Sequence, residues 1–139
     1  KSPKPGSSVR LSTEWEWQQA ATGGDPTREY PWEGGWDSSR CNSDESRLNR
    51  TTAVGMYLQG ATQQGAYDMA GNVSEWCVNE YEIPERPEAV RIHKGGIRRV
   101  VRGGCWKDEP FYHRASGRNC ISTAYQFNYL GFRLVQDIP

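Results

Sequence analysis

The sequence has little of the aliphatic material that usually builds a protein core. Only 35% of its 139 residues are hydrophobic, and the mean hydropathy is −0.86. No apolar run approaches the roughly 20 residues of a membrane span, so we expect no transmembrane segment. The 17 basic and 17 acidic residues cancel, which argues against a basic surface for nucleic acid.

Cysteine and histidine are also scarce, which limits the metal chemistry of the chain. The four cysteines match no pattern of closely paired zinc ligands and are too few for a disulfide scaffold. A disulfide between Cys41 and Cys77 is one alternative. The simpler expectation is that the cysteines are free thiols, as in the reducing cytoplasm. The two histidines, His93 and His113, are far apart in sequence, and we expect both at the surface.

Large aromatic side chains and turn residues are plentiful instead. Six Trp, seven Tyr and three Phe can replace aliphatics in a core, because each buries on the order of 150–250 Å². Disordered chains are poor in aromatics. Fifteen Gly and eight Pro indicate many turns. We therefore expect one ordered domain with little regular secondary structure.

One segment has clear helix signals. The stretch LSTEWEWQQAATGG predicts a helix of about nine residues. Ser12 or Thr13 is a suitable N-cap, Glu16 lies where a capping box forms, and the Gly pair at 23 and 24 ends the helix.

Strand signals are short and come late in the chain. Residues 98–102 and 131–135 are predicted to be strands. We expect one face of the first to be exposed to water. In the second, Phe132 and Leu134 lie on one face, and we expect Phe132 to belong to the packed framework of the domain. Residues 25–66 show no sustained period. A loop of that length is usually functional, or is tied by ions or side chains.

The segment YDMAGNVSEWC, residues 67–77, places two carboxylates around a Gly-Asn turn. Asp68 and Glu75 could simply cap or pair locally. Carboxylates and backbone carbonyls are also the ligands of a hard cation, and a glycine turn can aim carbonyls inward. Spacing alone leaves both interpretations open.

Seven motifs, in order, resemble those of the formylglycine-generating-enzyme (sulfatase-modifying-factor) family: RLSTEWEWQQAATGG, YPW, RTTAVGMY, YDMAGNVSEWC, RVVRGGCW, RASGRN and GFRLV. The resemblance implies an α+β, C-type lectin-like fold with short antiparallel strands, about two helices and many loops. It places the domain at residues 11–136 and makes 1–10 a linker or truncated start. Family domains usually begin further upstream, so we expect an N-terminal strand and helix to be missing.

The same resemblance implies a structural calcium ion at the Gly-Asn turn. Carried over by position, Asp68 and Glu75 would supply side-chain oxygens, and Gly71 and Val73 would supply backbone carbonyls. Ser74 stands where the family commonly has Trp, a change that removes no proposed ligand.

The copper site of the enzymes in this family has no counterpart here. Those enzymes hold copper with two cysteines, five residues apart, after a GGS motif. In this chain Cys105 replaces the serine of that motif and has no cysteine partner at the required spacing. The two ligand positions are occupied by Lys107, Asp108 or Glu109 and by Phe111, Tyr112 or His113. Because Cu(I) requires soft thiolates, we expect neither copper nor catalysis.

A second branch of the family, the variable proteins of diversity-generating retroelements, fits better. Its hallmark is a hypervariable tract between a GG-containing motif and a GFR motif, which here covers residues 105–130. The framework is present as Gly103, Gly104, Trp106, Pro110, Arg114, Ala115, Arg118, Asn119 and Gly131-Phe132-Arg133. The aromatics of the tract cluster without a regular period. With Ser, Thr and Asn beside them they resemble a selected binding surface, although a buried core is the alternative.

We therefore expect a ligand-binding module that displays a variable surface to a protein or other macromolecule. The expected contact residues are Lys107, Asp108, Glu109, Phe111, Tyr112, His113, Ser116, Asn119, Ile121, Ser122, Thr123, Tyr125, Phe127, Asn128 and Tyr129. The alternatives are a metal-dependent oxidase of the formylglycine-generating type or an iron-dependent relative, and a structural accessory domain of a larger signalling protein.

Overall fold

The computed structural model describes residues 6–81 and 98–138, so His93 lies outside the described residues. These residues form one α-helix, α1 (Glu14–Thr22), and six short strands. The strands are β1 (Val9–Leu11), β2 (Ser74–Glu80), β3 (Arg98–Arg102), β4 (Asn119–Ser122), β5 (Leu130–Phe132) and β6 (Leu134–Gln136). Four 3-10 helices complete the set: η1 (Ser38–Arg40), η2 (Asp44–Ser46), η3 (Leu58–Gly60) and η4 (Pro110–His113).

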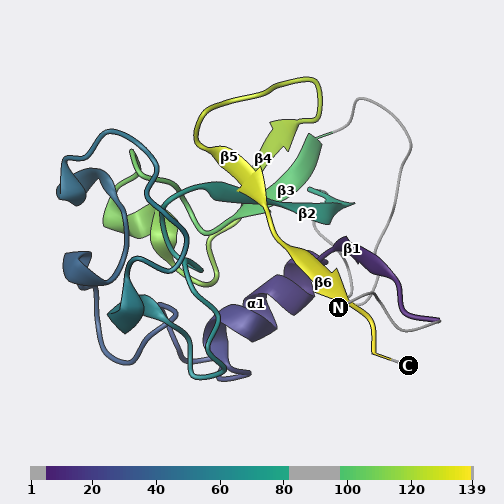
Figure 1. The fold of residues 1–139 in the computed structure, drawn as a ribbon, viewed down its shortest axis with the longest axis horizontal. Helices are drawn as coiled ribbons and strands as arrows, with labels where there is room; N and C mark the ends of the chain where they lie inside the picture. Colours follow the sequence, from purple (N-terminus) through teal and green to yellow (C-terminus); the bar gives the residue numbers. More distant parts are fainter. Residues whose placement is uncertain (1–5, 82–97, 139) are drawn as a thin grey trace.

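The strands form a four-stranded sheet in the order β4-β3-β2-β5 and a two-stranded sheet of β1 and β6. The pairs β2–β3 and β3–β4 are antiparallel, as expected, but β2 and β5 run parallel. Figure 1 shows the irregular segment with η1 to η3 on one side of the sheet, and the loop between β4 and β5 extending away from it.

The predicted helix is confirmed with its caps. The Thr13 side chain accepts from the Glu16 backbone N–H at 3.1 Å, and a Glu16 carboxylate oxygen accepts from the Thr13 N–H at 2.8 Å. Gly23 ends the helix with a φ of 68°. A second α-helix, expected from the family, is not found among the described residues. Four single-turn 3-10 helices occur instead. Three of them lie in the irregular segment, residues 25–66, which glycine, asparagine and proline interrupt every few residues.

Both ends of the domain depart from the sequence prediction. Residues 9 and 10, assigned to a linker, belong to β1 and pair with β6. The expected strand 131–135 is divided at Arg133, where the chain leaves the larger sheet and enters the smaller one. Phe132 and Leu134 are 63% and 58% exposed, so the expectation that Phe132 belongs to the packed framework is wrong.

Among residues 6–81 and 98–138, the buried hydrophobic side chains form two small clusters rather than one large one. The first contains Trp17, Ala21, Met69, Cys77, Val100 and Ala115, and the second contains Tyr30, Trp32, Cys41 and Ala70. Cys41 and Cys77 lie in different clusters, and all four cysteines are free. Burial raises the pKa of both thiols to about 12, so they stay protonated at neutral pH. No helix in the described ranges is long and apolar enough to cross a membrane.

The unequal burial of two aromatic residues gives a first test of this core. We expect Trp17→Ala to lower the free energy of unfolding by about 3–5 kcal/mol, because Trp17 is buried at the centre of its cluster. Phe132→Ala should cost no more than about 1 kcal/mol, because its ring is mostly in water. Urea denaturation measures both values, and equal losses would contradict the placement of Phe132.

Candidate functional site

The Gly-Asn turn between the two carboxylates joins two distant segments, the loop around Asn42 and residues 103–106. The Gly71 N–H donates to the Gly103 carbonyl at 2.9 Å, and the Asn72 N–H donates to the Asn42 carbonyl at 2.8 Å. The Asn72 carbonyl accepts from the Trp106 N–H at 3.0 Å. Gly71 has a φ of 74°, and a Cβ there would lie 2.3 Å from the Asn42 carbonyl oxygen, so only glycine fits.

Glu75, at the start of β2, is the buried acid of this region, with 5% of its surface exposed. One of its carboxylate oxygens accepts from Trp17 Nε1 at 2.7 Å and from Arg133 Nε at 2.6 Å, and the other accepts from Arg133 Nη2 at 2.7 Å. Arg133 Nη2 also donates to the Tyr67 carbonyl at 3.0 Å and approaches the Asp68 carbonyl at 3.4 Å. The guanidinium therefore bridges the Glu75 carboxylate and the backbone carbonyls of the turn.

This arrangement bears directly on the calcium prediction. Asp68, with a φ of 54°, accepts the Gly55 N–H on Oδ2 at 2.7 Å, and both oxygens of Glu75 already have protein donors. Across the part of the chain that the structure describes, no group of three or more His, Cys, Asp or Glu side chains could hold a metal. As they are arranged, the Glu75 carboxylate and the Asp68 carbonyl receive the Arg133 guanidinium, so Glu75 is already paired with a cation. Calcium stays a prediction of the resemblance.

The pairing of Glu75 with Arg133 makes a strong prediction about stability. Arg133→Met should lower the free energy of unfolding by about 3–5 kcal/mol, because it leaves the Glu75 carboxylate buried without its cation. Adding Glu75→Gln should restore part of that loss, because the unpaired charge is then removed. If the double variant is no more stable than Arg133→Met, the loss does not come from the unpaired carboxylate.

Melting curves of the unmodified protein and of the single variant Glu75→Gln test the calcium prediction. A calcium site requires that calcium raises the melting temperature of the unmodified protein and that Glu75→Gln abolishes this response, because an ion bound only by the folded state stabilises it. Identical melting curves in calcium and in chelator would contradict the site and leave Arg133 as the cation of the turn.

After β3, the Gly pair positions His113 in a way that the sequence did not predict. His113 is fully buried and stacks on Trp36, with ring centroids 5.3 Å apart. Its ring nitrogens lie 3.0 Å from the carbonyl oxygens of Gly103 and Asp108. A Cβ at Gly104 would come within 2.5 Å of the ring, so the glycine makes room for the histidine. The expectation that His113 lies at the surface and contacts a ligand is wrong.

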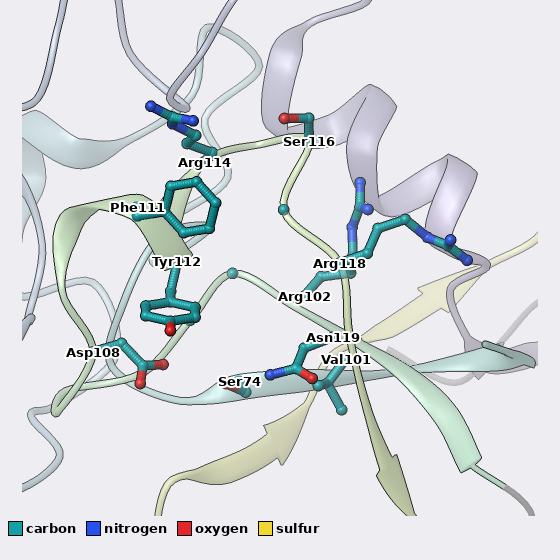
Figure 2. A pocket seen from close by; sticks show the side chains of 13 residues that line it. Ser74, Val101, Arg102, Asp108, Phe111, Tyr112, Arg114, Ser116, Arg118 and Asn119 are labelled. Carbon is teal, nitrogen blue, oxygen red and sulfur yellow. The ribbon is translucent and has the colours of Figure 1, made fainter. Parts of the chain in front are cut away.

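A cavity of about 420 Å³ opens beside this turn, between the Gly pair, η4 and residues 114–119. Figure 2 shows Phe111 and Tyr112 on one side of it, with Asp108 below them, and Arg102 and Arg118 across from the two rings. The expected contact residues that line the cavity are Asp108, Phe111, Tyr112, Ser116 and Asn119.

Arg102 is a residue of this cavity wall that sequence reasoning missed. It was expected on the wet face of a strand, but it is 2% exposed. Its Nη2 donates to Gln18 Oε1 at 2.6 Å and to the Ala115 carbonyl at 2.9 Å, and its Nη1 lies 3.6 Å from Glu14. Burial lowers the pKa of the Arg102 guanidinium. The sequence feature that could have indicated a buried arginine partner lies on the predicted helix, where Glu14 and Gln18 are four residues apart and share a face.

The second half of the tract forms an exposed ladder of rings, which we call the aromatic ladder: Tyr125, Phe127 and Tyr129. The ring centroids of Tyr125 and Phe127 are 5.7 Å apart, and those of Phe127 and Tyr129 are 4.9 Å apart. Lys107 Nζ lies 3.6 Å from the centroid of Tyr129. The three rings are spaced two residues apart, which the sequence interpretation overlooked, and they stack on one another in the loop between β4 and β5.

The remaining contact residues are displayed largely as expected. The exposed ones are Lys107, Glu109, Phe111, Tyr112, Ser116, Asn119, Thr123, Tyr125, Phe127 and Asn128, and the half-buried ones are Asp108, Ile121, Ser122 and Tyr129. The ladder adjoins the cavity, because the Ser74 N–H donates to the Tyr129 carbonyl at 2.8 Å and Ser74 lines the cavity. The aromatic ladder and the cavity are therefore neighbours at Ser74.

Comparison with known proteins assigns the family. The sulfatase-modifying factor enzyme 1-like domain matches residues 4–138, and the chain belongs to this family. It is 37% identical over 135 residues to the serine/threonine-protein kinase Pkn1 of Chlamydia pneumoniae, covering 93% of this chain and 21% of the kinase. It is 30% identical over 152 residues to the formylglycine-generating enzyme of Thermomonospora curvata, covering 92% of this chain and 49% of the enzyme.

A solved structure shares the fold. Treponema denticola variable protein 1 matches with a TM-score of 0.72 and 28% identity, covering 94% of this chain and 48% of that protein. The fold is thus a mixed α+β fold of the formylglycine-generating-enzyme type. This chain spans about half of the variable protein and of the enzyme, and about a fifth of the kinase.

Proposed function

We propose that this domain is a non-catalytic ligand-binding module that displays residues 105–130 as a variable surface to a protein or other macromolecule. The observation that supports it best is the exposure of the tract: every expected contact residue except His113 is exposed or half-buried. Its large rings contact one another and Lys107 instead of the core clusters. Exposed Tyr with Ser, Thr and Asn is typical of selected binding surfaces.

The framework around the tract supports the same proposal. Gly103 and Arg102 hold its beginning, and Gly131 and Arg133 hold its end, through contacts with residues outside the tract or with the backbone. The exposed side chains between them can then vary without loss of these contacts. The likeness to a Treponema variable protein is consistent with such a design.

The similarity to a Chlamydia kinase favours a second candidate, a binding domain within a larger signalling protein. This chain matches about a fifth of that kinase, as expected if the domain is one part of a longer polypeptide. An enzyme of the formylglycine-generating type is disfavoured by the copper ligand positions. Cys105 is buried, and burial raises the pKa of its thiol to about 12, far from the thiolate that Cu(I) needs.

Randomising the displayed residues tests the binding module. In a library in which Phe111, Tyr112, Ser116, Tyr125 and Phe127 are varied together, we expect most members to fold, because surface substitutions usually change stability by within about 0.5 kcal/mol. A matched library that varies Trp17, Met69, Gly71, Val100 and Arg102 should contain few folded members. Protease resistance of the displayed proteins gives the folded fraction. Equal fractions in the two libraries would contradict the proposal.

The absence of oxidase activity is a separate prediction. Incubated with Cu(I) and a cysteine-containing peptide, the protein should produce no aldehyde above the level of a heat-inactivated sample, because two thiolates at the copper spacing are missing. Mass spectrometry of the peptide detects the product. Turnover above that control would favour the enzyme.

A further inference from the structure

His113 is a fully buried histidine with no part in the displayed surface. It is the last residue of η4. The two residues before it on η4, Phe111 and Tyr112, line the cavity (Figure 2). The contacts of the His113 ring therefore decide how this wall of the cavity is held.

Both ring nitrogens of His113 face acceptors. Nδ1 lies 3.0 Å from the Gly103 carbonyl oxygen, and Nε2 lies 3.0 Å from the Asp108 carbonyl oxygen. A carbonyl only accepts, whereas a neutral imidazole carries one N–H and one lone pair. Either tautomer of the neutral ring would thus turn a lone pair toward a carbonyl oxygen inside the protein. The imidazolium, with two N–H groups, donates to both.

The surroundings of the ring also suit a cation. The ring stacks on Trp36 with the two planes 12° apart, and an indole face attracts positive charge. A Glu45 carboxylate oxygen accepts from Trp36 Nε1 at 3.2 Å, which brings a negative charge to the same indole. Asp108 adds a second carboxylate from the loop that carries one of the carbonyls. Burial by itself favours the neutral ring, so these contacts and the two charge-assisted hydrogen bonds have to outweigh it.

The other charged and titratable groups on the neighbouring elements do not compete with His113 near neutral pH. Arg114, the next residue, pairs with Glu29 at 2.8 Å. Lys107 and Glu109 are exposed. Burial raises the pKa of the Cys105 thiol to about 12, so it stays protonated. Histidine is the side chain that ordinarily titrates between pH 6 and 8.

The two carbonyls connect η4 to the framework of the domain. The Gly103 carbonyl also accepts the Gly71 N–H at 2.9 Å, and the Asp108 carbonyl also accepts the Asp44 N–H at 3.1 Å. The ring thus joins η4 to the Gly-Asn turn and to η2 at the same time.

We propose that His113 is a pH-sensitive link, an imidazolium that holds η4 against both carbonyls. Loss of one proton leaves a lone pair facing a carbonyl oxygen, breaks one of the two hydrogen bonds, and loosens the segment that carries Phe111 and Tyr112. The cavity wall is therefore fixed while the ring keeps both protons, and it loosens when the pH is raised. This device does not depend on which ligand the surface binds.

Nitrogen-15 NMR of the histidine rings counts the protons directly. The chain has two histidines, so the variant His93→Gln leaves only the His113 signals. At about pH 7.5 we expect both ring nitrogens of His113 to carry a proton, although a histidine in an unfolded chain titrates near pH 6.5 and is mostly neutral there. One unprotonated ring nitrogen at this pH would overturn the proposal.

Urea denaturation between about pH 6 and pH 8 measures the consequence for stability. Above about pH 6.5 the unfolded chain releases a proton that the folded chain keeps, so stability should fall as the pH rises. The unfolding equilibrium constant of the unmodified protein should increase by up to about tenfold per pH unit. His93→Gln, the matched control, should keep this dependence and His113→Gln should lose it. Equal pH dependence in all three proteins would contradict the link.

The amide signals of Phe111 and Tyr112 test whether the link holds the cavity wall. They should shift with the same midpoint as the His113 ring nitrogens. Amide signals that stay constant while His113 loses its proton would overturn the coupling to η4. If His113→Gln does not fold, the ring spectra and the pH profile of the unmodified protein still decide the outcome. None of these results alters the library test of the binding module, so the two proposals fail separately.

Discussion

The hydrogen bonds of the Gly71-Asn72 turn hold segments that have almost no regular structure of their own. Through this turn the loop around Asn42, the Gly pair after β3 and the start of β2 share one set of backbone contacts. The Asn72 side chain adds a contact with a further segment, because its Oδ1 accepts the Thr52 N–H at 2.9 Å. A chain with few aliphatic residues can remain ordered in this way, since buried backbone groups must find partners and here they find one another.

Glu75, three residues further on, fixes both ends of the tract, residues 105–130. In the sheet it stands opposite Arg102 on β3 and opposite Gly131 on β5, so the tract leaves one neighbour of β2 and returns on the other. Its carboxylate then binds Arg133, the residue that follows β5. The separation of the two ends is therefore set by β2 and not by the tract. A change of the exposed side chains between them would leave the entry and exit points in place.

The sequence correctly predicts features that depend on neighbouring residues. It does not predict features that depend on contacts between segments far apart in the chain. The capping box of Thr13 and Glu16 predicted α1, because both partners lie within one turn. The exposure of Tyr112 and Tyr125 followed from composition and framework motifs. The burial of His113, the exposure of Phe132 and the parallel pairing of β5 depend on contacts between segments far apart in sequence. Arg133 as partner of Glu75 belongs to the same class, because 58 residues separate them.

The framework also keeps the charges of the variable surface independent of those that hold the fold. The arginines that flank or interrupt the tract take their carboxylates from outside it: Arg102 and Arg118 from Glu14, Arg114 from Glu29, and Arg133 from Glu75. Removing one partner of a buried ion pair is costly, so a variable position must not supply that partner. Asp108 and Glu109 lie within the tract and neutralise none of these arginines. Replacing either carboxylate therefore leaves none of these four arginines without its partner.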